Sequence, residues 1–424
     1  MTRAVGSLYT SFLDAPPAAC VSVPFHRASD GSDEAANSSA SIVTNSGNDG
    51  GDDGGNGGSG GGGGGSAGSL LVTGTYTLDK DTQLRTGSLV LHEVVIKDKQ
   101  DGIELKHHQT LPLESGSVLD IRLLAASSSP PFPGGCKLLV ATSTGRVSVY
   151  STFPTSLELL STYEVTDPSI LILSLSISPN GRLVSATTSD SKIHILKFTD
   201  AEFTSLKQIS EIENVHTNLE AWTSIFSPDG NTLYSGGDDA SFAAWDLSSI
   251  NDSASEAEGG EEDEDQIVGQ TYRNRKIHTA GVTSILPITV SGKEYIITGS
   301  YDQFVRIFSP STNRWLNTSV DLDGGVWRLE LLSNQNFIPK EKGNSSDENT
   351  VIYVLASCMH AGCCILAVGF EEGGEESDEQ ITLTPIATMK EHESMNYASA
   401  CIGKNEPAFV STSFYDRRVC CWRL

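Results

Sequence analysis

Short runs rich in apolar and β-branched residues alternate with polar turns along most of the chain. Six segments share one pattern, in which a β-rich run, small residues and a polar turn precede a second β-rich run: residues 137–150, 183–196, 233–247, 295–308, 353–366 and 409–422. Residues 70–91 form a looser copy with a longer turn. Almost no stretch has the length or the 3.6-residue period of a helix. The pattern therefore predicts an all-β protein.

The copies recur at a regular distance. Their turn positions lie 46, 49, 63, 58 and 56 residues apart and are occupied by Thr144, Asp190, Asp239, Asp302, His360 and Asp416. The longer distances are those that contain polar inserts. One complete unit reads as four strands over residues 221–227, 231–236, 241–247 and 267–273. A period in the forties with four strands per unit is typical of a β-propeller.

The two ends of the chain predict how the ring closes. The last copy ends at Leu424 with its third strand, so its blade is one strand short. Residues 7–13 precede the first copy and can supply the missing outer strand. Joining both termini in one blade removes an exposed sheet edge. We therefore predict one domain over residues 1–424, a seven-bladed propeller.

Polar inserts interrupt the repeat and carry much of the charge. We predict disordered loops over residues 28–69, 250–266, 333–350 and 369–380, because such stretches cannot bury enough apolar surface to become ordered. Three acidic runs (30–53, 251–265 and 371–379) hold 20 of the 54 acidic residues and no Lys or Arg. The formal net charge of −26 thus describes the inserts more than the rest of the chain, where 34 acids face 28 bases. The sequence shows no basic footprint for nucleic acid.

Composition indicates a cytoplasmic protein. No window approaches the roughly 18 consecutive apolar residues of a membrane span, and Asp14 with two prolines follows too early for a secretory signal. The eight cysteines form no C-x-x-C pair and most lie in apolar runs, so we expect free thiols in a reducing compartment. No metal is expected, because no ligand cluster has the usual spacing.

Three histidines indicate the type of repeat. They precede acidic turn positions by 23 or 24 residues, in the pairs His216 and Asp239, His278 and Asp302, and His392 and Asp416. This spacing resembles the tryptophan-aspartate (WD40) repeat, in which a histidine before the first strand pairs with the turn acid. Trp245-Asp246 keeps the dipeptide that gives the repeat its name. We expect structural hydrogen-bond networks here rather than catalysis.

The sixth copy departs from this rule. Its turn position is His360, and the position of its blade histidine, near Leu322, holds no histidine. A histidine without the usual structural partner is a candidate for function. The alternative is an ordinary turn residue.

The loops that enter the innermost strands form a common binding face in propellers. In the fourth and sixth copies these loops contain Glu220-Ala-Trp222 and Gly324-Gly-Val-Trp327-Arg328. Two tyrosines, Tyr301 and Tyr415, lie beside turn acids. Together these side chains predict an aromatic, acidic pocket that suits a quaternary ammonium ion. The alternative is that the tryptophans only pack the blades.

Several segments together carry a more specific resemblance. They are residues 216–222, 234–239, 298–302, 324–328, 358–360 and 413–416, and the block 71–78 followed by Gly87-Ser-Leu belongs with them. In this order they resemble the diphthine methyl ester hydrolases, WD40 proteins also called diphthine methyltransferases. Generic WD40 repeats would not share Gly-Gly-Val-Trp-Arg at 324–328 or Cys-Met-His at 358–360. The resemblance extends from about residue 7 to residue 424 and fails only in the inserts.

The resemblance implies an enzyme of diphthamide biosynthesis. Members of this family hydrolyse the methyl ester of methylated diphthine, a histidine derivative of translation elongation factor 2 that also carries a trimethylammonium group. It therefore implies elongation factor 2 as the protein substrate and no cofactor. The trimethylammonium group is the cation that the aromatic, acidic pocket would suit. We expect a cytoplasmic monomer that binds neither nucleic acid nor membrane.

Ester hydrolysis needs a base or nucleophile and donors for the oxyanion. Our hypothesis is that His360 acts as base toward a water molecule and Arg328 stabilises the oxyanion. The residues expected to bind the cation are Glu220, Trp222, Tyr301 and Trp327. Cys358 as nucleophile is less favoured, because its apolar run suggests burial, which raises a thiol pKa. The competing hypothesis is a non-catalytic WD40 scaffold or substrate receptor, since fold alone does not decide function.

Overall fold

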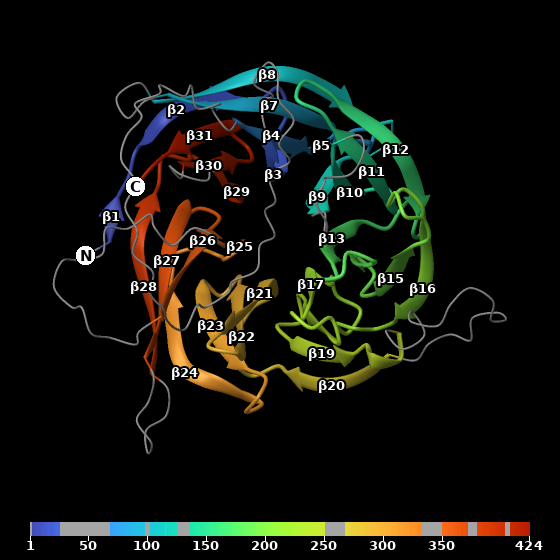
Figure 1. Cartoon of the computed structure of the whole chain (residues 1–424), viewed down its shortest axis with the longest axis vertical. Coiled ribbons are helices and arrows are strands. Elements are labelled where there is room, and N and C mark those ends of the chain that lie inside the picture. Colours follow the sequence, from blue (N-terminus) through green and yellow to red (C-terminus); the bar gives the residue numbers. More distant parts are fainter. Residues whose placement is uncertain are drawn as a thin grey trace, which may run out of the picture.

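The structure is a computed structural model that describes residues 2–25, 68–97, 102–114, 116–124, 135–250, 268–332, 350–371, 380–402 and 408–424. Seven sheets stand around a common axis like the blades of a propeller (Figure 1), and each contains four antiparallel strands. In blades 1 to 6 these four strands begin nearest the axis and follow one another outward, whereas the outer strand of blade 7 comes from the N-terminal segment. The all-β, seven-bladed fold predicted from the repeat is therefore confirmed.

The first three blades follow one another along the chain. Blade 1 consists of β3 (Pro17–Phe25), β4 (Gly68–Thr75), β7 (Ser88–Ile96) and β8 (Ile103–Pro112). A two-stranded hairpin of β5 (Thr77–Leu78) and β6 (Arg85–Thr86) lengthens its central turn. Blade 2 consists of β9 (Val118–Leu124), β10 (Cys136–Thr142), β11 (Arg146–Thr152) and β12 (Leu157–Glu164). Blade 3 consists of β13 (Ile172–Ile177), β14 (Leu183–Thr188), β15 (Ile193–Phe198) and β16 (Leu206–Ile212).

Blades 4 to 6 are also built from strands that follow one another along the chain. Blade 4 consists of β17 (Thr223–Phe226), β18 (Thr232–Gly236), β19 (Phe242–Asp246) and β20 (Gly269–Asn274). Blade 5 consists of β21 (Val282–Val290), β22 (Lys293–Ser300), β23 (Phe304–Ser309) and β24 (Arg314–Asp321). Blade 6 consists of β25 (Arg328–Leu331), β26 (Thr350–Ser357), β27 (Cys363–Glu371) and β28 (Gln380–Met389).

Blade 7 joins the two ends of the chain. Its inner strands are β29 (Asn396–Ile402), β30 (Ala408–Ser413) and β31 (Arg418–Trp422), and its outer strand is β2 (Ser7–Phe12). Strand β2 pairs antiparallel with β31, in the place that the sequence indicated for residues 7–13. A second pairing did not follow from the sequence: β1 (Arg3–Ala4) adds a parallel strand to β28 of blade 6. The N-terminal segment thus adds a strand to each of two adjacent blades, 6 and 7.

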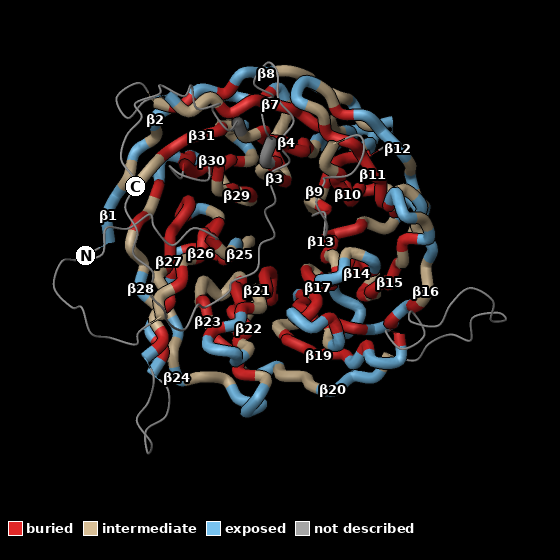
Figure 2. Tube along the Cα trace, in the orientation of Figure 1, coloured by how far each residue is buried: buried red, intermediate tan, exposed pale blue. Residues whose placement is uncertain are grey.

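The core lies between the blades. Among the described residues, buried apolar side chains form seven clusters, each shared by two adjacent blades. The second strands, such as β10 and β14, are almost wholly buried, whereas the outer strands β12 and β24 expose about every second residue, as Figure 2 shows. This gradient is what a stack of face-to-face sheets requires.

The predicted inserts fall mostly outside the described residues, but their predicted edges were too wide. Residues 68 and 69 belong to β4, residue 350 begins β26, residues 369–371 belong to β27 and residue 380 to β28, while Ile250 is buried between blades 3 and 4. The reason is local packing, because Phe370 joins the apolar cluster between blades 5 and 6. Within the described ranges, no helix is long and apolar enough to cross a membrane.

Candidate functional site

An aromatic cluster formed by Trp222, Tyr301 and Trp327 lies at one end of blades 4 to 6. The ring centroids of Trp222 and Trp327 are 5.5 Å apart, and those of Tyr301 lie 5.9 and 5.8 Å from the two tryptophans. All three side chains are half-buried. Trp222 and Trp327 precede innermost strands and Tyr301 follows a second strand, positions that share one face of an antiparallel blade. The structure therefore brings these three predicted residues together.

Glycines allow the chain to pass this closely. A Cβ atom on Gly324 would lie 2.3 Å from the carbonyl oxygen of Cys358, and one on Gly325 would lie 2.6 Å from Sδ of Met359. A Cβ on Gly281 would lie 3.0 Å from the Tyr301 ring. The absence of side chains at these positions lets the loop before β25 pack between two neighbouring turns. This packing places Trp327 beside Tyr301.

The cluster continues around the same face into blades 7 and 1. Tyr397 lies 5.1 Å from Trp327 and 5.4 Å from Phe414, and Phe414 lies 6.2 Å from Tyr76, measured between ring centroids. Tyr415 contacts Phe414 at 5.0 Å but is 70% exposed, so it lies at the margin. The sequence interpretation missed Tyr397, Phe414 and Tyr76 as members of this arc.

A positional signal in the repeat could have found them. Trp222, Trp327 and Tyr397 each follow a residue whose N–H donates to a carbonyl at the second strand or turn of the preceding blade. Tyr76, Tyr301 and Phe414 each directly follow a second strand. The arc therefore consists of two repeat positions that are aromatic in several blades.

Two acidic groups accompany the cluster. The indole Nε1 of Trp222 donates to Oδ1 of Asp238 at 3.0 Å, and the N–H of Asp238 donates to the carbonyl of Glu220 at 2.9 Å. Burial raises the pKa of Tyr301 well above its usual value, and the nearby Tyr397, Asp238 and Glu220 add to the effect. Negative charge beside aromatic faces favours a cation. Asp238 is a site residue that the sequence interpretation did not include.

Arg328 begins β25 and reaches across the propeller axis. Its Nη2 lies 3.4 Å from Oδ1 of Asp120 in β9, a strand on the opposite side of the ring in Figure 1. Its guanidinium carbon is 5.7 Å from the Trp327 ring centroid. The group thus borders the aromatic cluster and remains about one-fifth exposed. A cationic donor at this place could stabilise a developing oxyanion.

Glu330 lies two residues farther along β25, and its side chain is exposed. Nearby protein still removes part of the water around its carboxyl group, which raises the pKa of Glu330 to about 7, while a hydrogen bond from the Cys401 backbone and the charge of Arg122 oppose the rise. A carboxyl group with such a pKa can accept a proton near neutral pH. The sequence interpretation did not include Glu330 among the site residues.

The structure does not bring His360 into contact with the other predicted residues. It lies in the turn between β26 and β27, it is exposed, and within the described chain its side chain makes no hydrogen bond or ion pair. Its neighbour Met359 has a φ of 43° and accepts a hydrogen bond from the Asn396 N–H at 2.9 Å. The turn therefore lies on the same face as the aromatic cluster, but the imidazole is not held by protein groups.

Cys358 is a poor nucleophile in this structure. Its side chain is 1% exposed, and burial raises the pKa of its thiol well above the ordinary value. A thiolate is the reactive form, so this environment suppresses reactivity. All eight cysteines are free. In the described parts of the chain, no group of three or more His, Cys, Asp or Glu side chains has the geometry of a metal site.

The blade histidines take structural roles, each in a different way. Nδ1 of His216 lies 2.9 Å from Oδ1 of Asp239, and its Nε2 lies 3.1 Å from Oγ of Ser235, which also accepts from Trp245. Burial lowers the pKa of His216, although the hydrogen bond to Asp239 opposes this effect. The expected pair is therefore present in blade 4.

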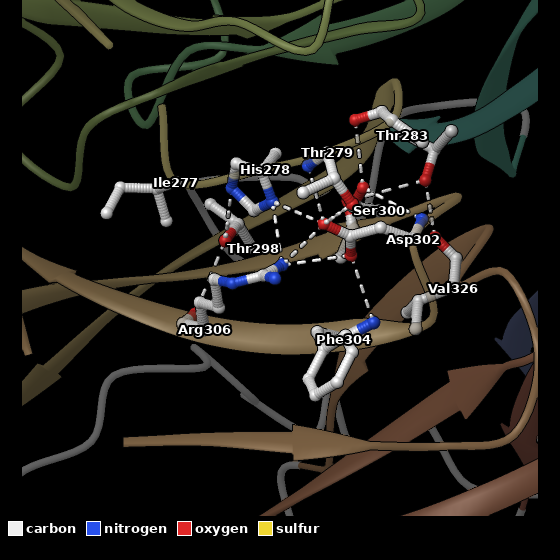
Figure 3. Close-up of polar contacts among 12 residues, drawn as sticks. Ile277, His278, Thr279, Thr283, Thr298, Ser300, Asp302, Phe304, Arg306 and Val326 are labelled. Atoms are coloured by element: carbon white, nitrogen blue, oxygen red, sulfur yellow. Dashed lines mark hydrogen bonds and ion pairs between the residues drawn. The ribbon is translucent and has the colours of Figure 1, made fainter. Parts of the chain in front are cut away.

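In blade 5 an arginine intervenes between histidine and acid. Arg306 donates to both carboxylate oxygens of Asp302 at 2.9 Å and lies 3.1 Å from Nδ1 of His278, as Figure 3 shows. His278 itself is 3.9 Å from Asp302. In blade 7 the Nε2 of His392 contacts Oγ of Ser411 at 2.9 Å instead of Asp416. Direct pairing was thus predicted correctly for one blade of three.

Comparisons with known proteins agree with the repeat and with most of the chain length. Residues 213–246 match the family described as WD domain, G-beta repeat. The chain is 30% identical over 355 residues to diphthine methyltransferase of Schizosaccharomyces pombe, and this alignment covers 83% of this chain and 90% of the relative. It is 25% identical over 411 residues to diphthine methyltransferase of Saccharomyces cerevisiae, with 83% and 92% covered.

More distant matches are shorter or concern the fold alone. Human diphthine methyltransferase is 27% identical over 170 residues, 39% of this chain and 29% of the human protein. One chain in the crystal structure of a mitotic checkpoint complex superposes with a TM-score of 0.52 at 14% identity and 84% coverage of both chains. That likeness shows a shared propeller fold.

Proposed function

The chain belongs to the diphthine methyltransferase family, and on this premise we propose that it hydrolyses the methyl ester of methylated diphthine on translation elongation factor 2. Water adds to the ester carbonyl, the bond from the acyl carbon to the methoxy oxygen breaks, and the products are the diphthine carboxylate, methanol and a proton. The family is named after methyl transfer, but the reaction proposed here removes the methyl group of the ester.

The observation that supports the proposal is the aromatic cluster with its acids. Trp222, Tyr301 and Trp327 contact one another within 6 Å between ring centroids, and Asp238 accepts a hydrogen bond from Trp222. Such a set of ring faces and carboxylates suits the trimethylammonium group of the substrate, a contact worth about 0.5–2 kcal/mol per ring. Arg328, next to Trp327 in sequence, would then lie near the ester.

We propose one role for each of the residues predicted from the sequence. Glu220, Trp222, Tyr301 and Trp327 bind the cation, and Arg328 stabilises the oxyanion. His360 acts as base toward water once the protein substrate covers its exposed turn. The proposal includes elongation factor 2 as the partner, a cytoplasmic monomer as the active form, and no cofactor.

Mass spectrometry of elongation factor 2 tests the reaction directly. Incubation of the methylated-diphthine form with the purified chain should convert one methyl ester into a carboxylic acid at the modified histidine and release methanol. A stable complex without any mass change would instead favour a non-catalytic scaffold. No change and no complex would contradict both functions.

Substitution of His360 tests the proposed base. His360→Gln should lower kcat by about 10²- to 10⁴-fold, the usual contribution of a general base, with little change in KM. His107→Gln is the matched control, because His107 is also exposed and lies on the outer strand β8. If His360→Gln and His107→Gln both keep full kcat, another group is the base.

A further inference from the structure

One register position of the innermost strands carries opposite charges in two blades. At this position each strand pairs with a residue at or next to the end of the second strand; its occupants are Ala19, Asp120, Ser174, Thr223, Ser284, Arg328 and Ala398. Five of the seven are small or carry a hydroxyl group. The two charged ones, in blades 2 and 6, are the partners that meet across the axis.

The position two residues farther along each innermost strand also carries opposite charges in blades 2 and 6, but there the base is in blade 2 and the acid is in blade 6. Two residues farther along, blade 2 has Arg122 and blade 6 has Glu330, whereas the other blades have Val21, Ser176, Ile225, Leu286 and Ala400. The charge of Arg122 acts on Glu330. An acid followed by a base in blade 2 thus faces a base followed by an acid in blade 6, which is the complementary order.

Asp120 is held firmly by its own side of the ring. Its Oδ2 accepts from the Leu175 N–H at 2.8 Å, from Arg122 Nε at 3.0 Å and from Ser174 Oγ at 3.4 Å, and its Oδ1 accepts from its neighbour's N–H, that of Ile121, at 3.1 Å. The Asp120 side chain is 5% exposed and that of Arg328 is 20% exposed. A fixed carboxylate therefore faces a guanidinium that has more freedom.

We infer that Asp120 is a positioning residue that holds the Arg328 guanidinium across the axis, so that blade 2 completes a site whose other walls come from blades 4 to 6. The inference rests on the proposed function, because it concerns the donor assigned to the oxyanion. An arginine side chain loses considerable rotamer freedom when it is fixed, and a bond to an immobile carboxylate fixes it before the substrate arrives. Preorganised donors are the effective ones in catalysis.

Asp120→Ser is the sharpest variant. Serine occupies the same position in blades 3 and 5, and Oγ of Ser284 accepts the Leu329 N–H at 2.9 Å just as Asp120 accepts that of Leu175. The substitution thus keeps the link between blades and removes the carboxylate, together with its ion pairs to Arg122 and Arg328. We expect kcat to fall about 10- to 100-fold through misplacement of Arg328, with KM almost unchanged because the aromatic cluster is intact. Unchanged kcat would overturn the inference.

Chemical rescue separates positioning from a merely structural role. Added guanidinium ion should restore part of the activity of Arg328→Ala, because Asp120 still offers its carboxylate. In the double variant Asp120→Ser with Arg328→Ala, rescue should be about tenfold weaker or lost. Equal rescue in both backgrounds, or none in Arg328→Ala alone, would contradict the inference.

Controls distinguish the inference from the proposed function. Ser176→Ala removes a comparable inner-strand hydrogen bond, to the Phe226 N–H at 3.3 Å, and should leave kcat unchanged. Thermal unfolding of each variant reports whether the fold is kept, and Asp120→Asn repeats the charge removal if Asp120→Ser does not fold. An inactive wild type would refute the proposed function and the inference together. An active wild type with a fully active Asp120→Ser variant would refute the inference alone.

Discussion

At the scale of single residues, the blade histidines show how burial couples to protonation. Both ring nitrogens of His216 have polar partners, whereas Nδ1 of His392 has no hydrogen-bond partner among the described residues. Burial lowers the pKa of His392 to about 4, although the charge of Asp416 opposes the shift. The imidazole is therefore neutral in the folded protein over a range of pH where the unfolded chain is protonated.

This difference predicts a loss of stability in mild acid. Between pH 6.5 and 4 the unfolded state binds a proton at His392 and the folded state does not, so the free energy of unfolding falls as pH falls. The contribution of one such histidine is about 3 kcal/mol across the window. Urea unfolding of His392→Gln should show a shallower pH dependence than the wild type. Identical slopes would mean that His392 titrates alike in both states.

The candidate site was predictable where an unusual residue stood in a recognisable loop. Trp222 and Trp327 were found because tryptophan is conspicuous before an innermost strand, and Tyr301 because it borders a turn acid. Tyr397 was missed because it lies within a strand of alternating residues, where an aromatic side chain is ordinary. Asp120 was missed for another reason: its partner Arg328 is four blades away along the chain, and only ring closure brings them together.

At the scale of elements, the loop before β25 is the tightest part of the aromatic face. Gly324 approaches the Cys358 backbone so closely that a Cβ would lie 2.3 Å from the carbonyl oxygen. The carbonyl oxygen of Cys358 belongs to the backbone, so it cannot move aside as the end of a flexible side chain can. The turn between β26 and β27 and the loop that carries Trp327 are therefore fixed relative to each other.

Gly324→Ala should disturb both stability and substrate binding. Overpacking of this kind costs about 1–3 kcal/mol, and the displaced loop would move Trp327 away from Trp222 and Tyr301. We expect a lower Tm and a higher KM, measured by thermal unfolding and by the ester hydrolysis assay. Gly269→Ala in β20 is the control, since a Cβ there meets nothing within 4 Å. Equal Tm and KM in the two variants would contradict this account.

The elements themselves were largely predictable. The repeat gave the central hairpin of each blade, because two β-rich runs around a polar turn are a strong local signal. Strand β1 and the hairpin of β5 and β6 were not predicted, because two-residue strands such as Arg3–Ala4 have no measurable periodicity. Strand β1 forms on the edge that β28 offers, whereas β5 and β6 pair with each other in a two-stranded sheet.

At the scale of the whole molecule, the ring is held by contacts between neighbours and by one closure. Each apolar cluster joins two adjacent blades, so no single central core exists within the described residues. The closure depends on β2, whose Ser7 to Phe12 pair with Trp422 to Arg418. Without β2, strand β31 would present an open edge.

Deletion of residues 1–13 should therefore open the ring at blade 7. An unpaired edge strand invites pairing with other chains, so we expect a lower Tm and oligomers in size-exclusion chromatography with light scattering. Deletion of residues 1–5 is the matched control, because it removes β1 and keeps β2. A fully monomeric 1–13 deletion with the Tm of the wild type would contradict the role of β2.

The closure by β2 also sets an order of events during synthesis. The ribosome makes β2 before blades 1 to 6 and makes its partner β31 after them. At about 5–20 residues per second, translation separates the two by roughly 20–80 seconds. Throughout that time blades 1 to 6 can assemble in sequence, but β2 has no strand to pair with. The nascent propeller is thus an open arc, and it becomes a closed ring only once β31 has left the ribosome.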